Sequence, residues 1–198
     1  MRLKNLEISG FKSFSKKTVL EFQNPIVSIV GPNGSGKSNV VEAIRFVLGE
    51  QSMKSMRGLL GSDLIFKGSK NLPKSSRAVV TIYFNNSDKI FKLSNETGGN
   101  INLNYDVISI SREVYSDGLN KYILNGSEVR LKDINNLLAS VNIGSSGHHI
   151  ISQGEADRIL NASARDRREM VEDALGLKIY QYKIKEAQRK LERTAGNM

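Results

Sequence analysis

The sequence of 198 residues contains no cysteine, no tryptophan, three prolines and two histidines. The missing cysteines exclude disulfide bonds and thiolate metal sites. The two histidines, His148 and His149, have no carboxylate at ligand spacing, so we interpret them as structural residues. The sequence has neither a signal peptide nor an apolar run long enough to cross a membrane, and we therefore expect a cytoplasmic protein.

Acidic residues are also few, because 20 aspartates and glutamates stand against 29 lysines and arginines, for a net charge of +9. This imbalance suggests a polyanionic partner, and nucleic acid is favoured over a membrane since no basic amphipathic anchor is present. A surface whose lysines serve only solubility is the alternative. The hydrophobic content of 39% is modest but clustered, which predicts a core in one sizeable domain or two small ones.

The most specific motif is a glycine-rich stretch, Gly31-Pro32-Asn33-Gly34-Ser35-Gly36-Lys37-Ser38. It follows an apolar run at 26–30 and precedes a helix-like segment at 39–48, which is the strand–loop–helix context of a phosphate-binding P-loop. The glycines let the backbone curl so that successive N–H groups point at phosphate oxygens. Lys37 should reach the β- and γ-phosphates and the Ser38 hydroxyl should ligate Mg²⁺, so the motif predicts binding of ATP or a related triphosphate.

The remaining elements follow from the spacing of apolar residues. Alternation predicts strands at 2–9, 18–22, 78–84, 89–93, 107–114 and 121–124, with turns at 85–88 and 125–126. Helical spacing predicts helices at 131–139 and 164–175, and a short heptad pattern follows from Leu177 to Leu191. We expect the strands in the middle of the chain to form an antiparallel sheet, distinct from the strand that leads into the P-loop.

One expected part of a P-loop ATPase is missing. Such enzymes hold Mg²⁺ with a carboxylate at the end of a second apolar strand, and no run of four apolar residues followed by Asp-Glu is present. Asp106 precedes its strand and so lies at the wrong end. The sequence therefore predicts a nucleotide-binding chain with half of a catalytic apparatus, whose other half belongs to another polypeptide or to the remainder of a longer one.

The motifs together resemble the amino terminus of SMC proteins, the chromosome-organising ATPases, and most closely the prokaryotic homodimeric members. The likeness covers residues 1 to about 193, and its motifs occur in the family's order. They are the opening segment 3–14, the P-loop at 31–39, and the stretches 44–50, 57–66, 151–154 and 167–176.

This resemblance implies an α/β fold, an ABC-type half-head with a parallel or mixed core sheet, an antiparallel β-subdomain and a C-terminal coiled-coil root helix. The head lobe would span 1–176 and a truncated start of the coiled coil would span 177–198. The implied partners are the chain's own carboxy-terminal head lobe, a second head in an ATP-sandwiched homodimer, double-stranded DNA, and a kleisin-type subunit near the coiled-coil root. The implied location is the nucleoid.

The resemblance also assigns roles to single residues. Gln153 would be the Q-loop glutamine that contacts Mg²⁺ and the attacking water, with an ordinary loop residue as the alternative. Arg57 would act near the γ-phosphate, with a solvated surface arginine as the alternative. Lys12 and Ser13 would lie near the base or ribose. The remaining nucleotide contacts would come from Pro32, Asn33, Gly34, Ser35, Gly36, Lys37, Ser38 and Asn39.

The DNA-contact candidates are basic residues in the loop after the P-loop helix and in the sheet. They are Lys54, Lys70, Lys74, Arg77, Arg112 and Lys121. No aromatic residues are interleaved with them, so we expect phosphate contacts without sequence preference.

Three other interpretations remain open from the sequence. The chain could be the head lobe of a related repair ATPase of the RecN or zinc-hook type. It could be a small self-contained P-loop kinase or GTPase, although the missing second carboxylate argues against this. It could also be a DNA-binding module with a vestigial P-loop, although the intact Lys37 and Ser38 argue otherwise.

Overall fold

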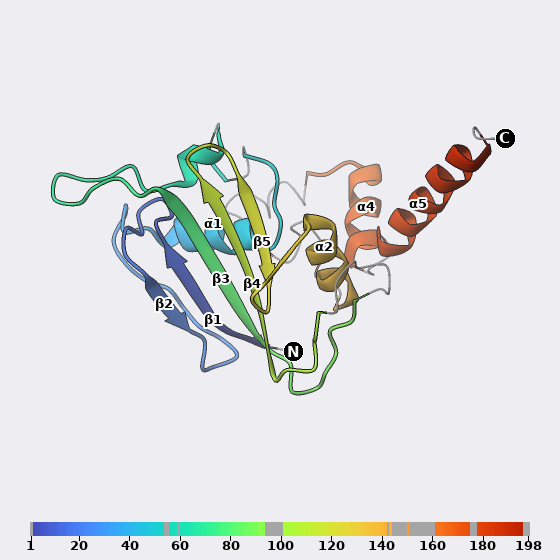
Figure 1. Ribbon diagram of the computed structural model, residues 1–198, viewed down its shortest axis with the longest axis horizontal. Helices are drawn as coiled ribbons and strands as arrows, with labels where there is room; N and C mark the ends of the chain where they lie inside the picture. Colours follow the sequence, from blue (N-terminus) through green and yellow to red (C-terminus); the bar gives the residue numbers. More distant parts are fainter. Residues whose placement is uncertain are drawn as a thin grey trace. The chain divides into compact units, whose positions relative to one another are not determined.

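Six strands form one sheet in the order β2-β1-β3-β4-β5-β6, and each neighbouring pair is antiparallel (Figure 1). They are β1 (Arg2–Ser9), β2 (Thr18–Glu21), β3 (Arg77–Asn85), β4 (Val107–Tyr115), β5 (Asn120–Leu124) and β6 (Ser127–Val129). The computed structural model describes residues 2–53, 56–58, 60–93, 101–141, 143, 150, 161–174 and 178–195. The chain divides into two compact units, Met1–Val141 and Asn142–Met198, and each is described by itself.

One face of the sheet is apolar and carries the core. Along β3, Ala78, Val80, Ile82 and Phe84 are buried while the residues between them are more exposed, as the two-residue period of a strand requires. The helix α1 (Lys37–Val47) packs against β3 and β4 and covers the apolar face. Burial of each such side chain contributes about 1.5–3 kcal/mol, so this contact holds the P-loop helix on the sheet.

The first strand, β1, contains a β-bulge between Leu3 and Asn5. Leu3 pairs with Phe84 and Asn5 pairs with Tyr83, so Lys4 has no opposite residue of its own. The extra residue shifts the alternation by one, and Leu6 and Ile8 then point into the core with 0% exposure. The bulge therefore explains why strict alternation fails at Asn5.

The helix predicted after the P-loop is confirmed, and its apolar residues are buried unequally. Val40, Ala43, Phe46 and Val47 are buried, whereas Val41 is 37% exposed. The helix ends before Gly49, whose φ of +98° is the left-handed conformation that terminates helices at low cost for glycine.

The predicted strand at 26–30 and the parallel or mixed core sheet are not observed. Ile26 and Val30 are each 87% exposed, and the segment finds no strand to pair with among the described residues. The strands in the middle of the chain do form an antiparallel sheet. The opening strands belong to it as well, because β1 bonds to β3 on one side and to β2 on the other.

A strand predicted at 89–93 is a loop, and the side chain of Asn86 explains why. The Asn86 amide, 1% exposed, donates to the carbonyl oxygens of Leu103 (3.1 Å) and Tyr105 (2.9 Å) and accepts from the backbone N–H of Ile90 (3.1 Å). The Asn86 side chain thus occupies backbone N–H and C=O groups that would otherwise be free to bond to a neighbouring strand of a sheet. Asn125 and Gly126, both with positive φ, form the predicted hairpin turn between β5 and β6.

Three further helices match the predicted ones. Helix α2 (Leu131–Ser140) belongs to the first unit and buries Ile134, Leu137 and Leu138. The second unit contains α4 (Ala164–Ala174) and α5 (Lys178–Ala195). In α5 the heptad positions Ile184 and Leu191 are 57% and 70% exposed. The predicted boundary at 176/177 lies outside the described residues and stays a prediction. Across the described chain, every helix is too short or too polar to span a bilayer.

Candidate nucleotide site

The P-loop is curled in the way its glycines predict. Gly34 and Gly36 have φ of +80° and +93°, a conformation that costs other residues free energy. A Cβ at Gly36 would also lie 2.7 Å from the Ser13 hydroxyl, so no side chain fits there. The loop leads directly into the first turn of α1, and both the loop's N–H groups and the helix dipole favour an anion at this point.

The Lys37 ammonium folds back over the P-loop. It donates to the carbonyl oxygens of Gly31 (2.6 Å) and Pro32 (2.7 Å). These bonds hold the Lys37 ammonium against the backbone of the P-loop, which is the segment that would surround a phosphate. The donor set of backbone N–H groups, Lys37 and the exposed Ser38 hydroxyl fits a triphosphate with Mg²⁺.

Ser13, in the loop between β1 and β2, is hydrogen-bonded to Asn39 on the P-loop helix α1. The Asn39 amide donates to the Ser13 hydroxyl (2.8 Å), and its carbonyl oxygen lies 3.5 Å from an Arg57 guanidinium nitrogen. Four residues that the resemblance places near the nucleotide, Lys12, Ser13, Asn39 and Arg57, are thus brought together beside the P-loop.

The residue that joins them was not anticipated. Glu42 on α1 is 5% exposed, and its carboxylate accepts hydrogen bonds from the Lys12 ammonium and the Arg57 guanidinium. A buried carboxylate is costly unless it is paired, so these two cations account for its presence on the apolar face of the helix. The only signal in the sequence was an acidic residue between Val41 and Ala43, close after the P-loop.

Arg112, a DNA-contact candidate, is buried and has a structural role. It is 2% exposed, and its guanidinium donates to the carbonyl oxygens of Phe46 (3.0 Å) and Glu50 (2.6 Å) at the end of α1. It also donates to the Asn120 side-chain oxygen and lies over the rings of Phe46 (4.2 Å) and Tyr122 (5.0 Å). Burial lowers its pKa, yet an arginine stays charged and caps the helix. Arg112 is therefore removed from the exposed basic set.

The other basic candidates that the structure describes, Lys70, Lys74, Arg77 and Lys121, are on the surface. The segment between the 3₁₀ helix η1 (Gly61–Leu64) and β3 projects beyond the sheet (Figure 1) and carries Lys70 and Lys74. Neither lysine makes an ion pair within the described residues. Arg77 pairs with Glu113 (3.2 Å) and Lys121 with Glu128 (3.1 Å). Hydrogen bonds to Tyr115 and to Glu128 raise the pKa of Arg77 and of Lys121 respectively, so both remain cationic.

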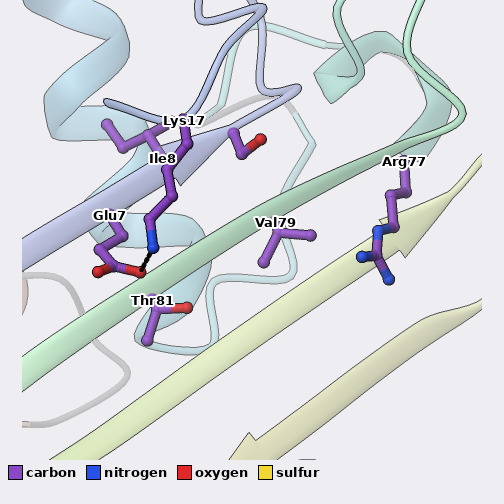
Figure 2. Close-up of a pocket in the computed structure, with 7 residues that line it drawn as sticks. Glu7, Ile8, Lys17, Arg77, Val79 and Thr81 are labelled. Carbon is purple, nitrogen blue, oxygen red and sulfur yellow. Dashed lines mark ion pairs between the residues drawn. The ribbon is translucent and has the colours of Figure 1, made fainter. Parts of the chain in front are cut away.

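A shallow pocket lies on the opposite face of the sheet, away from α1 (Figure 2). Glu7 and Thr81 line it, and they alternate along their strands with side chains that are buried under α1. Lys17 and Glu7 form an ion pair of 2.9 Å across it, and this hydrogen bond raises the pKa of Lys17. The charges here satisfy each other, so the pocket offers no phosphate cradle.

Several predicted residues lie outside the described residues, namely Lys54, His148, His149 and Gln153. Their roles stay predictions. Among the described residues there is no group of three or more His, Cys, Asp or Glu that could hold a metal ion by itself. The expected Mg²⁺ ligands, Ser38 and Gln153, stay predictions.

Known proteins with related sequences were compared with this chain. Residues 2–162 match the family described as the RecF/RecN/SMC N terminal domain. The chromosome partition protein Smc of Halothermothrix orenii is 46% identical over 194 residues, which cover 98% of this chain and 16% of that protein. The Smc protein of Lactiplantibacillus plantarum is 46% identical over 180 residues, covering 91% and 14% respectively. The chain thus spans only about a sixth of the length of these relatives.

Solved structures share the fold as well. One, from work on ATP-driven dimerization and DNA-stimulated activation of SMC ATPases, is 40% identical with a TM-score of 0.76, over 88% of this chain and 99% of that one. Another is a Smc head domain with an extended coiled coil, bound to the C-terminal domain of ScpA and derived from Pyrococcus furiosus. It is 40% identical with a TM-score of 0.78, over 98% of this chain and 47% of that one.

Proposed function

This chain belongs to the RecF/RecN/SMC family, as an amino-terminal head domain of the Smc type, and from that premise we propose that it is the ATP-binding half of a two-lobed ATPase head. The observation that carries the proposal is the curled P-loop with Lys37 bonded across it at the start of α1. In the assembled protein, this half and a carboxy-terminal lobe complete one site, and two heads engage around ATP. The activity serves chromosome partition.

The similarity to Smc proteins favours this function over the alternatives. The likeness to the two Smc relatives covers 98% and 91% of the chain, which supports an Smc head over a repair ATPase of the RecN or zinc-hook type. A self-contained kinase or GTPase would carry its second carboxylate in the same chain. The preformed P-loop argues against a vestigial site.

Replacing Lys37 tests the nucleotide site. Lys37→Ala removes a charge-assisted phosphate contact of about 1.5–3 kcal/mol, so the affinity for Mg²⁺-ATP should fall roughly ten- to hundredfold. Titration with a fluorescent ATP analogue measures the change. Lys4→Ala, in the β1 bulge, is the control and should bind as the unaltered chain does. Equal affinities for all three proteins would refute the proposed site.

The partners follow from the same premise. An ABC-type head needs a carboxy-terminal lobe, and a solved relative is an Smc head domain with an extended coiled coil bound to the C-terminal domain of ScpA, a kleisin-type subunit. The exposed heptad positions of α5 support a coiled-coil root that continues with further residues and another helix. We assign the 26–30 segment to the contact with the carboxy-terminal lobe, because an exposed apolar segment without a partner strand among the described residues needs another part of the protein to cover it.

We also infer that the projecting segment before β3 contacts DNA phosphates. Lys70 and Lys74 are exposed and carry no ion pair within the described residues, so binding DNA would not require them to release a carboxylate. Lys121 and Arg77 each have a carboxylate partner, which reduces the charge they offer. Contacts to phosphate carry no sequence information, so binding should not depend on sequence.

Charge reversal on this segment tests the DNA surface. The double change Lys70→Glu and Lys74→Glu should weaken duplex binding at low salt and reduce the salt slope by about 2, because two fewer counterions are released. Fluorescence anisotropy across a salt series measures this. Lys4→Glu with Lys89→Glu changes the net charge equally and should have a smaller effect. If both pairs lowered the affinity equally, net charge alone would explain the binding.

A further inference from the structure

Glu42 is the one buried carboxylate beside the P-loop whose role the proposed function leaves unexplained. It lies on the first half of α1, where its neighbours Ala43 and Phe46 are 0% exposed. A carboxylate in such a position lowers stability unless cations and hydrogen bonds compensate for the lost water. Both of its oxygens are used, because Lys12 binds Oε2 and Arg57 binds Oε1.

The two cations come from separate loops, and each has an unfavourable backbone conformation. Lys12 has φ of +47° and Arg57 has φ of +50°, a region that residues other than glycine rarely adopt. Two hydrogen bonds hold Lys12 in this conformation. Its backbone N–H donates to the Leu64 carbonyl oxygen (2.8 Å), and its ammonium donates to the carbonyl oxygen of Met56, the residue before Arg57. Strained residues of this kind persist only where the surroundings hold them, and they concentrate at functional sites.

The same cluster touches the P-loop. Asn39, one helical turn before Glu42, donates to the Ser13 hydroxyl, and that hydroxyl lies against Gly36. One carboxylate on α1 therefore fixes the loop that carries Lys12 and Ser13 and the loop that carries Arg57, both at the end of the helix where the phosphate site begins. The side chain of Arg57 remains 60% exposed although its guanidinium is paired.

We propose that Glu42 is the positioning residue of the nucleotide site, which holds the Lys12 and Arg57 cations beside the P-loop in the geometry that binds the triphosphate. Glu42 itself does not touch the nucleotide. Without its charge, Lys12 and Arg57 repel each other, and a neutral amide has one acceptor oxygen in place of two and an NH₂ donor in place of the other. The two loops then lose their common anchor. This inference rests on the proposed ATP site and deepens it.

The test is Glu42→Gln, which keeps the side chain's size and removes its charge. The affinity for Mg²⁺-ATP, measured by titration with a fluorescent analogue, should fall roughly tenfold, within the range for directly coupled neighbours. Glu7→Gln is the control, because Glu7 is a half-buried carboxylate that is also paired with a lysine but lies on the other face of the sheet. It should leave the affinity unchanged.

A double-mutant cycle separates positioning from a merely structural role. In an Arg57→Ala background, Glu42→Gln should lower the ATP affinity less than it does alone, because one of the cations it positions is already absent. Thermal unfolding of each variant reports any loss of stability. The proposal fails if Glu42→Gln binds ATP as tightly as the unaltered chain, or if its effect is the same with and without Arg57. A failure of the proposed ATP site itself would be distinguishable, because Lys37→Ala would then leave the ATP affinity unchanged.

Discussion

Mixing this chain with the carboxy-terminal head lobe of the same protein should raise ATP hydrolysis from essentially none to steady turnover. The chain holds phosphate-binding groups, but its described residues contain no cluster of carboxylates for Mg²⁺. A single group that stabilises the charge of the transition state typically contributes a factor of about 10² to 10⁵, so supplying the missing groups should raise the rate at least about a hundredfold. Phosphate release measured against the concentration of added lobe gives the result.

Two variants serve as controls for this experiment. Lys37→Ala should abolish the turnover of the mixture, which excludes a contaminating ATPase. Gln153→Ala should slow turnover by weakening the placement of water and Mg²⁺ while leaving ATP binding close to normal. Phosphate release by the chain alone, proportional to its concentration and sensitive to Lys37→Ala, would contradict a divided active site.

Arg112→Ala should destabilise the first unit by about 3 kcal/mol, because it removes the hydrogen bonds of a buried guanidinium to the carbonyl oxygens of Phe46 and Glu50 and to the Asn120 side chain. Stacking on Phe46 and Tyr122 is lost with it. For a chain of this size, such a loss lowers the midpoint of thermal unfolding by roughly 6–12 °C. Thermal unfolding followed by circular dichroism measures the shift.

Arg77→Ala is the matched control, since Arg77 lies on the adjacent strand and its ion pair with Glu113 is exposed. Exposed pairs contribute only about 0–1 kcal/mol, so its unfolding midpoint should move little. Equal shifts for the two variants would mean that the contacts of Arg112 with the end of α1 do not stabilise the fold.

Local chemistry made much of this fold predictable. The P-loop and the helix after it follow from glycine spacing and apolar periodicity, and the β5–β6 turn follows from Asn125-Gly126. These signals depend on residues within a few positions of each other. Most helix and strand types were right for that reason, and the strand at 89–93 was wrong because Asn86 is engaged by a segment more than 15 residues away.

What could not be predicted depends on contacts between distant segments. The ion pair of Glu42 with Lys12 joins residues 30 apart, and Arg112 reaches the end of α1 across 66 residues. Composition gives a glutamate and an arginine no reason to be buried, so Glu42 went unnoticed and Arg112 was assigned to the surface. Likewise, the apolar residues of 26–30 predict a strand, but they do not tell whether the described residues contain a strand that pairs with it.

The exposed stretch Ile26–Val30 has a practical consequence for anyone who purifies this chain. An exposed apolar segment with free backbone groups is a template on which another strand can pair. In two copies of this chain, each segment can pair with the other. Expressed alone, the protein should therefore aggregate increasingly as its concentration rises. Co-expression with a lobe that covers the segment should raise the soluble yield, and Val30→Lys should do the same at the expense of that pairing.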